Sequence, residues 1–99
     1  MAEFLVELYV PGTDAAAAGC GAKSARLAAE ELSREGTEVT YLQSIFVPED
    51  ETCFFLYEAA AAEDVEEAAR RASIPFERIA EALTHSEGRV TCTRRNAFR

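Results

Sequence analysis

Hydrophobic and polar positions alternate over the first ten residues, as they do in a β-strand with one buried face. The pattern predicts a strand over 3–10, which Pro11-Gly12 ends. One side of this strand carries Phe4, Val6, Leu8 and Val10, and the other side carries Leu5, Glu7 and Tyr9.

After this strand, apolar residues recur at helical spacing. This pattern predicts a helix over 22–35 with Gly36 as its C-terminal cap. The preceding stretch, 14–20, is rich in alanine but contains Gly19, and Gly21 follows it. We therefore expect a loop or a loose first turn there.

Two β-rich segments then predict a hairpin, with strands over 39–47 and 52–58 and a turn at Pro48–Glu51. The run Cys53–Tyr57 is apolar on both faces, as in a central strand.

A second helix is predicted over 59–72, because its acidic residues come early and Arg70 and Arg71 come last. A fourth strand is expected over 78–84, with Ile79 and Leu83 inward, and a short helix there is the alternative.

This order of elements predicts a ferredoxin-like α+β fold, in which a four-stranded antiparallel sheet carries two helices on one face. We expect one domain over 1–85, followed by a basic tail or an extra edge strand over 86–99. The other sheet face is left bare, and a bare apolar face usually marks an interaction site. The pattern therefore predicts a homodimer formed through the open sheet face.

The net charge of −8 over 99 residues is unevenly distributed, since residues 86–99 carry four arginines against Glu87 alone. An acidic body repels phosphate, so we expect no nucleic-acid partner. The three cysteines, Cys20, Cys53 and Cys92, are odd in number and far apart, which is typical of reduced thiols in a cytoplasmic protein. No segment reaches the length of a membrane span, so no membrane partner is expected.

Three segments, Tyr41–Ser44, Phe55–Ala59 and Ala72–Ile79, resemble the small bacterial nickel-binding-protein-like family. The resemblance extends over about residues 3–84 and implies a ferredoxin-like domain of mostly undefined function. It also suggests nickel as a cofactor. Two positions depart from the family pattern, because Gln43 stands where a histidine is usual and Phe55 where a cysteine is frequent. Neither side chain replaces such a ligand.

Two other residues are candidate metal ligands. Cys53 lies on the same strand face as Phe55, and His85 is the single histidine of the chain. Among the remaining polar and aromatic strand residues, the candidates for ligand binding are Glu7, Tyr9, Gln43, Tyr57 and Glu58.

These observations favour a non-catalytic binding or regulatory protein, because no spacing typical of a catalytic site is present. The alternative is a cofactor-free dimeric α/β-barrel enzyme of isomerase or monooxygenase type. In that enzyme Glu7 and Glu58 would exchange protons in a pocket on the open face, together with His85. A third hypothesis is a protein-interaction domain that docks through its tail.

Overall fold

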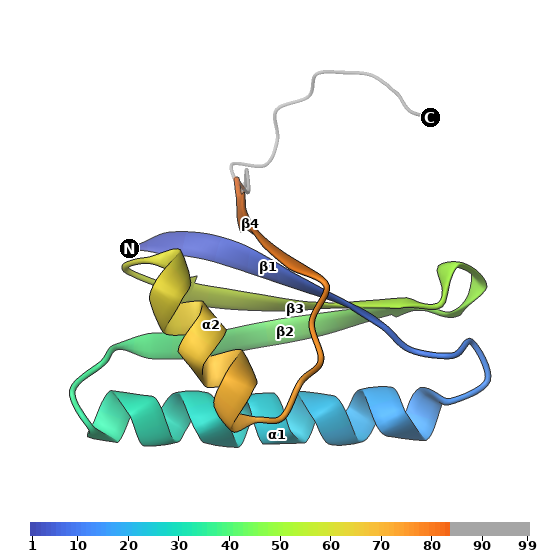
Figure 1. Ribbon diagram of the computed structural model, residues 1–99, viewed down its shortest axis with the longest axis horizontal. Helices are drawn as coiled ribbons and strands as arrows, with labels where there is room; N and C mark the ends of the chain where they lie inside the picture. Colours follow the sequence, from blue (N-terminus) through green and yellow to red (C-terminus); the bar gives the residue numbers. More distant parts are fainter. Residues whose placement is uncertain (84–99) are drawn as a thin grey trace, which may run out of the picture.

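Residues 1–83 are described by a computed structural model, in which one sheet carries two helices on the same side (Figure 1). The order β-α-β-β-α-β and the open antiparallel sheet confirm the predicted ferredoxin-like α+β fold. The elements are β1 (Ala2–Tyr9), α1 (Ala15–Arg34), β2 (Val39–Val47), a 3-10 turn (Pro48–Asp50), β3 (Thr52–Ala59), α2 (Ala62–Arg71) and β4 (Arg78–Ala82).

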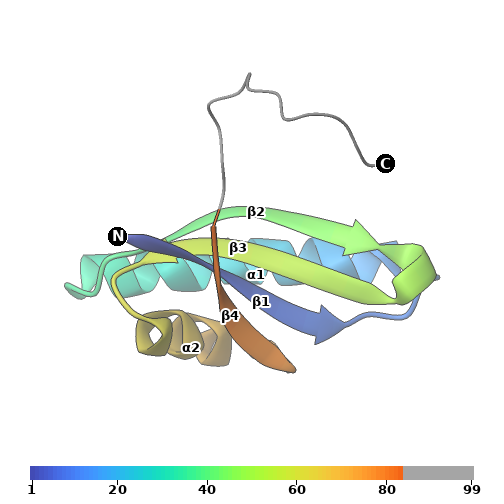
Figure 2. The same ribbon diagram turned by 90° about the horizontal axis from the view of Figure 1, so that it is seen from above.

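The four strands lie in the order β2-β3-β1-β4, and each pairs antiparallel with its neighbours. The predicted hairpin of β2 and β3 is confirmed. β3 and β1 occupy the centre of the sheet, so β2 and β4 are its edges (Figure 2). Neither described helix is both long and apolar enough to cross a membrane.

The core lies between the sheet and the two helices. Cys53, Phe55 and Tyr57 on β3 are 0% exposed and face this layer together with alternate residues of β1. Large side chains of the sheet thus meet mostly small side chains of the helices. The helix residues in the same cluster are Ala18, Ala25, Ala29, Leu32, Val65, Ala68 and Ala69.

The start of α1 differs from the sequence-based expectation, because the helix begins at Ala15 and includes the stretch predicted as a loop. Asp14 caps it: its side chain accepts a hydrogen bond of 3.0 Å from the backbone N–H of Ala17. This cap and the high helix propensity of alanine offset the cost of Gly19 and Gly21. The predicted loop over 14–20 was therefore wrong.

Other boundaries shift by a few residues. α2 begins at Ala62 and not at 59, since Ala59 still belongs to β3 and pairs with Ala2 and Val39. The fourth strand is confirmed as a strand, but its last residue is Ala82. Leu83, which was expected to point inward, is 81% exposed.

The C-terminal end of α1 has the predicted glycine cap, because Gly36 has a φ of 105°. Beside it, Arg71 of α2 binds both carboxylate oxygens of Glu35 at 2.8 and 2.9 Å and also contacts Glu31 and Glu67. The hydrogen bond from Arg71 lowers the pKa of the Glu35 carboxyl. These pairs are largely exposed, so they contribute little to the stability of the fold.

Gly19 and Gly21 offer a matched test of how closely α1 approaches the sheet. A Cβ atom at Gly19 would meet open space, whereas one at Gly21 would lie 3.2 Å from Cζ of Phe55. Gly19→Ala should therefore raise the free energy of unfolding by about 0.5–1 kcal/mol. Gly21→Ala should raise it less or lower it, because Phe55 must move. Urea unfolding measures both, and equal gains would show that the helix does not constrain Phe55.

Candidate functional site

The candidate site is the open sheet face, which we define as the side of the sheet turned away from α1 and α2 (Figure 2). Strand register brings its apolar residues together. In one row Leu5 of β1 lies opposite Leu56 of β3 and Ala80 of β4, and Gln43 continues the row on β2. In the neighbouring row, Phe54 lies opposite Ile45 and Glu7, and Glu7 lies opposite Arg78.

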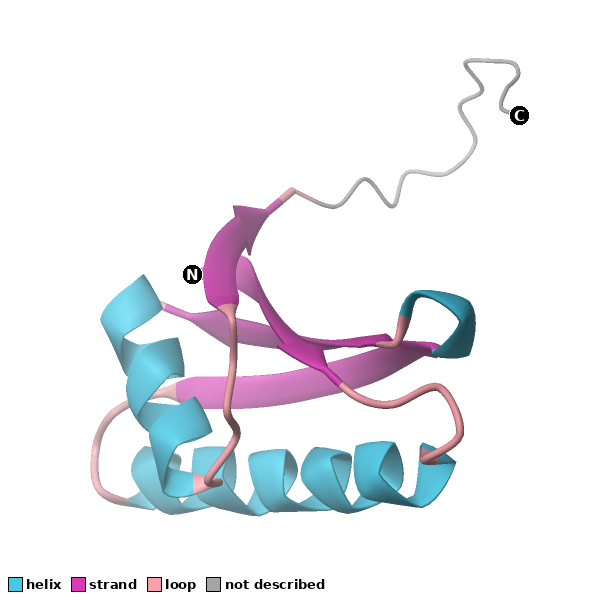
Figure 3. Cartoon of the chain, turned by 45° about the vertical axis from the view of Figure 1, so that its right-hand side comes forward, coloured by secondary structure: helices cyan, strands magenta, loops and turns pink. Residues whose placement is uncertain are grey.

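Several large side chains of this face are exposed to solvent. Ile45 is 48% exposed and Tyr9 is 55% exposed, although Leu56 at the centre is already buried by its neighbours. Figure 3 shows both helices on the other side of the sheet. Within residues 1–83 this surface is therefore uncovered by any helix.

A β-bulge in β2 decides which of its residues reach the open face. Tyr41 pairs with Tyr57, but the next pair is Gln43 with Leu56, so Leu42 is an extra residue. The bulge shifts the alternation and turns Gln43 and Ile45 to the open side, while Phe46 packs against the core. Sequence alternation alone did not identify Ile45, because a bulge has no reliable sequence signal.

The two carboxylates proposed for proton transfer lie apart. Glu58 is opposite Glu3, whereas Glu7 is opposite Phe54, four positions farther along β1, or about 13 Å. Glu7 instead accepts a hydrogen bond of 2.8 Å from Nε of Arg78, a partner that the sequence did not reveal. The geometry does not support the alternative enzyme hypothesis, which needs Glu7 and Glu58 in one pocket.

Of the other predicted ligand-binding residues, Tyr9 and Gln43 lie on the open face and Tyr57 does not. Tyr57 is buried on the helix side, where its ring meets that of Tyr41 edge-on at a centroid distance of 5.7 Å. Its hydroxyl has no hydrogen-bond partner within residues 1–83. Burial, and secondarily Tyr41, raises the pKa of this hydroxyl.

Of the two candidate metal ligands, the structure describes Cys53 and not His85. Cys53 is fully buried among apolar side chains, and burial raises the pKa of its thiol, whereas a metal needs the thiolate. His85 lies outside the described residues. Gln43 and Phe55, the two positions at which the sequence was expected to depart from the family pattern, are on opposite faces of the sheet.

Residues 1–83 hold no group of three or more histidine, cysteine, aspartate or glutamate side chains that could bind a metal ion. Together with the buried thiol of Cys53, this shows that the described part of the chain does not fit a nickel site.

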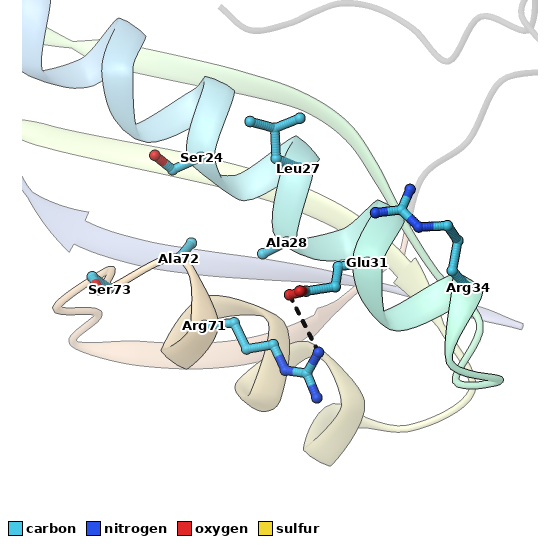
Figure 4. Close-up of a pocket in the computed structure, with 8 residues that line it drawn as sticks. All are labelled: Ser24, Leu27, Ala28, Glu31, Arg34, Arg71, Ala72 and Ser73. Carbon is cyan, nitrogen blue, oxygen red and sulfur yellow. Dashed lines mark hydrogen bonds and ion pairs between the residues drawn. The ribbon is translucent and has the colours of Figure 1, made fainter.

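A hollow lies away from the open face, between the two helices (Figure 4). It has a volume of about 600 Å³, and its rim carries Arg34 and Arg71. Arg71 is already bound by carboxylates, whereas Arg34 forms no ion pair within residues 1–83. Glu7 and Tyr9 line a much smaller hollow of about 90 Å³ at the end of β1.

Strand order, helix placement and the open face define the class of protein, a ferredoxin-like α+β domain with one uncovered sheet face. A comparison with models of protein families matches residues 4–82 to the family described as nickel responsive protein SCO4226-like. The match covers most of the chain, and the chain belongs to this family, which confirms the predicted relationship. No curated protein and no solved structure matches the chain.

The buried hydroxyl of Tyr57 has a measurable consequence. Tyr57→Phe should leave the free energy of unfolding unchanged at neutral pH or raise it by up to about 1 kcal/mol, because it removes an unpaired buried polar atom. The pKa of the hydroxyl is raised in the folded state, so the unfolded chain ionises first, and stability falls as the pH rises above about 10.

Tyr57→Phe should reduce this alkaline loss, and urea unfolding between about pH 8 and 11 measures it. Tyr9→Phe is the matched control, because the exposed Tyr9 should change neither quantity. A marked destabilisation by Tyr57→Phe at neutral pH would instead show that the hydroxyl has a partner.

Proposed function

We propose that this protein is a non-catalytic binding protein that acts as a homodimer, with the open sheet faces of its two subunits packed against each other. The observation that carries the proposal is the apolar surface around the buried Leu56 on that face, to which the partly exposed Leu5 and Phe54 and the exposed Ile45 contribute. Exposed apolar surface of this kind favours association, since each large side chain that becomes fully buried contributes about 1.5–3 kcal/mol.

The charges of the face are compatible with a two-fold dimer. Arg78 is neutralised by Glu7 at one side of the apolar rows, so covering this pair leaves no unpaired charge. The carboxylate of Glu58 lies at the end of its strand, where it can stay in contact with water. A two-fold axis through the centre would place the same apolar residues of both subunits against one another.

Binding is favoured over catalysis because the charged residues at the centre of this face, Glu7 and Arg78, are already joined in an ion pair. Tyr9 and Gln43 share the face with Glu7, and they are the residues that could orient a small apolar ligand at the edge of the interface. The described cysteines, Cys20 and Cys53, are free thiols, which suits the reducing cytoplasm.

Family membership alone supports a connection between this chain and nickel, since the family is described as nickel responsive. The donor set of residues 1–83 gives no further support. We infer that residues 1–83 have kept the fold of the family without a preformed nickel site. We also infer that the ligand of the protein contacts the open face.

The dimer is tested by placing a charge on the open face. Ile45→Lys should shift the protein from dimer to monomer, because a buried unpaired ammonium is costly. Sedimentation equilibrium or light scattering measures the mass. Leu27→Lys is the matched control, because Leu27 is 50% exposed but lies on α1. A monomeric parent protein, or a dimer that survives Ile45→Lys, would contradict the proposal.

Nickel binding is tested by calorimetric titration of the full chain with a nickel salt. We expect that residues 1–83 bind no nickel saturably. Cys53→Ser should leave the heat of titration unchanged, because that thiol is buried and protonated. Tight binding that Cys53→Ser abolishes would contradict this inference. Binding that His85→Ala abolishes would place the ligand in the segment after residue 83 and leave the inference on the body intact.

A further inference from the structure

A second surface with a defined chemical character lies between α2 and β4. It is a groove of about 390 Å³ lined by Ala62, Glu63, Glu66, Phe76, Arg78 and Ile79. Phe76 and Ile79 are partly buried and pack against the core, so they give the groove an apolar side. Glu63 and Glu66 at the start of α2 give it an acidic side.

The charges of this groove favour a basic occupant. Glu63 forms no ion pair within residues 1–83, and Glu66 approaches Arg70 only at 4.0 Å. Arg78, the one basic residue of the lining, is bound to Glu7 at 2.8 Å. A segment that brings arginines to this groove would therefore meet carboxylates without a strong partner.

The groove runs beside a free strand edge. Among residues 1–83, β4 pairs with β1 alone, so the backbone groups on its other side are not paired by any described strand and could accept a further one. It is also the last element described before the chain continues into residues 84–99. Those residues contain Arg89, Arg94, Arg95 and Arg99.

The sequence of the continuing segment suits a strand. In Arg89–Thr93 valine and cysteine alternate with threonine, which gives one apolar and one polar side. The residues 83–88, which include Gly88, are enough to reverse the direction of the chain next to β4. The other edge strand, β2, lies on the far side of β1 and β3 and is harder to reach.

We propose that residues 89–93 dock on the free edge of β4 of the same chain as a fifth, antiparallel strand. Val90 and Cys92 would face the apolar side of the groove, and Arg94, which falls on the same side of the strand, would face Glu63 and Glu66. The groove shares Arg78 with the open face, but its other lining residues lie on α2, on the connection to β4 or on the helix side of β4, so this inference does not depend on the proposed dimer.

Hydrogen exchange of the full chain, followed by mass spectrometry, tests the docking. Backbone amides of 89–93 and of β4 should be protected. Thr91→Pro should raise exchange in both segments by about tenfold or more, because proline removes a strand donor. Asn96→Pro is the matched control outside the strand and should change neither. Unaltered protection in β1 shows in each variant that the fold is intact.

A charge variant tests the acidic side of the groove. Glu63→Lys should raise exchange over 89–93, whereas Glu49→Lys, an equal change of charge in the turn between β2 and β3, should not. Exchange of 89–93 at the rate of an unstructured peptide in the parent protein would overturn the proposal. Protection that grows with protein concentration would also overturn it, since the segment would then occupy the groove of another copy.

Discussion

The close contact between the large side chains of β3 and the alanine-rich faces of the helices is the constraint on which this structure depends. Phe55 and Tyr57 fill the layer, and α1 can approach them because residue 21 is glycine. Protein interiors are close-packed, so large residues on one layer require small residues on the other. The small residues of both helices pack against the same side of the sheet, and its reverse side stays open within residues 1–83.

In this arrangement the surfaces that could bind a partner are the open sheet face and the two sheet edges. The open face carries apolar rows because β1 and β3 are central strands, with large residues on both sides. The two sheet edges differ in kind. β2 has nine uncharged residues with a bulge near its middle, and a bulge hinders pairing with a further strand. β4 is shorter and lies beside an acidic groove, which favours a basic strand over an arbitrary one.

Sequence patterns predicted the strands and their order well, because alternation and the Pro48 turn are local signals. These patterns failed where neighbouring residues favoured different secondary structures. Two glycines near Cys20 suggested a loop, but the Asp14 cap and the alanines continued the helix. The site was less predictable, because the bulge at Leu42 and the pairing of Glu7 with Arg78 depend on contacts between distant segments.

The bulge also bears on the family's connection with nickel. A histidine at the position of Gln43 would lie on the open face beside Leu56, whereas a cysteine at the position of Phe55 would lie in the core. Side chains on opposite faces of a sheet cannot bind the same ion within one subunit. A glutamine on the open face therefore removes the one donor of this pair that solvent could reach. What remains there is an apolar surface with a polar margin, formed by Leu5, Phe54 and Leu56 beside Gln43 and Glu7.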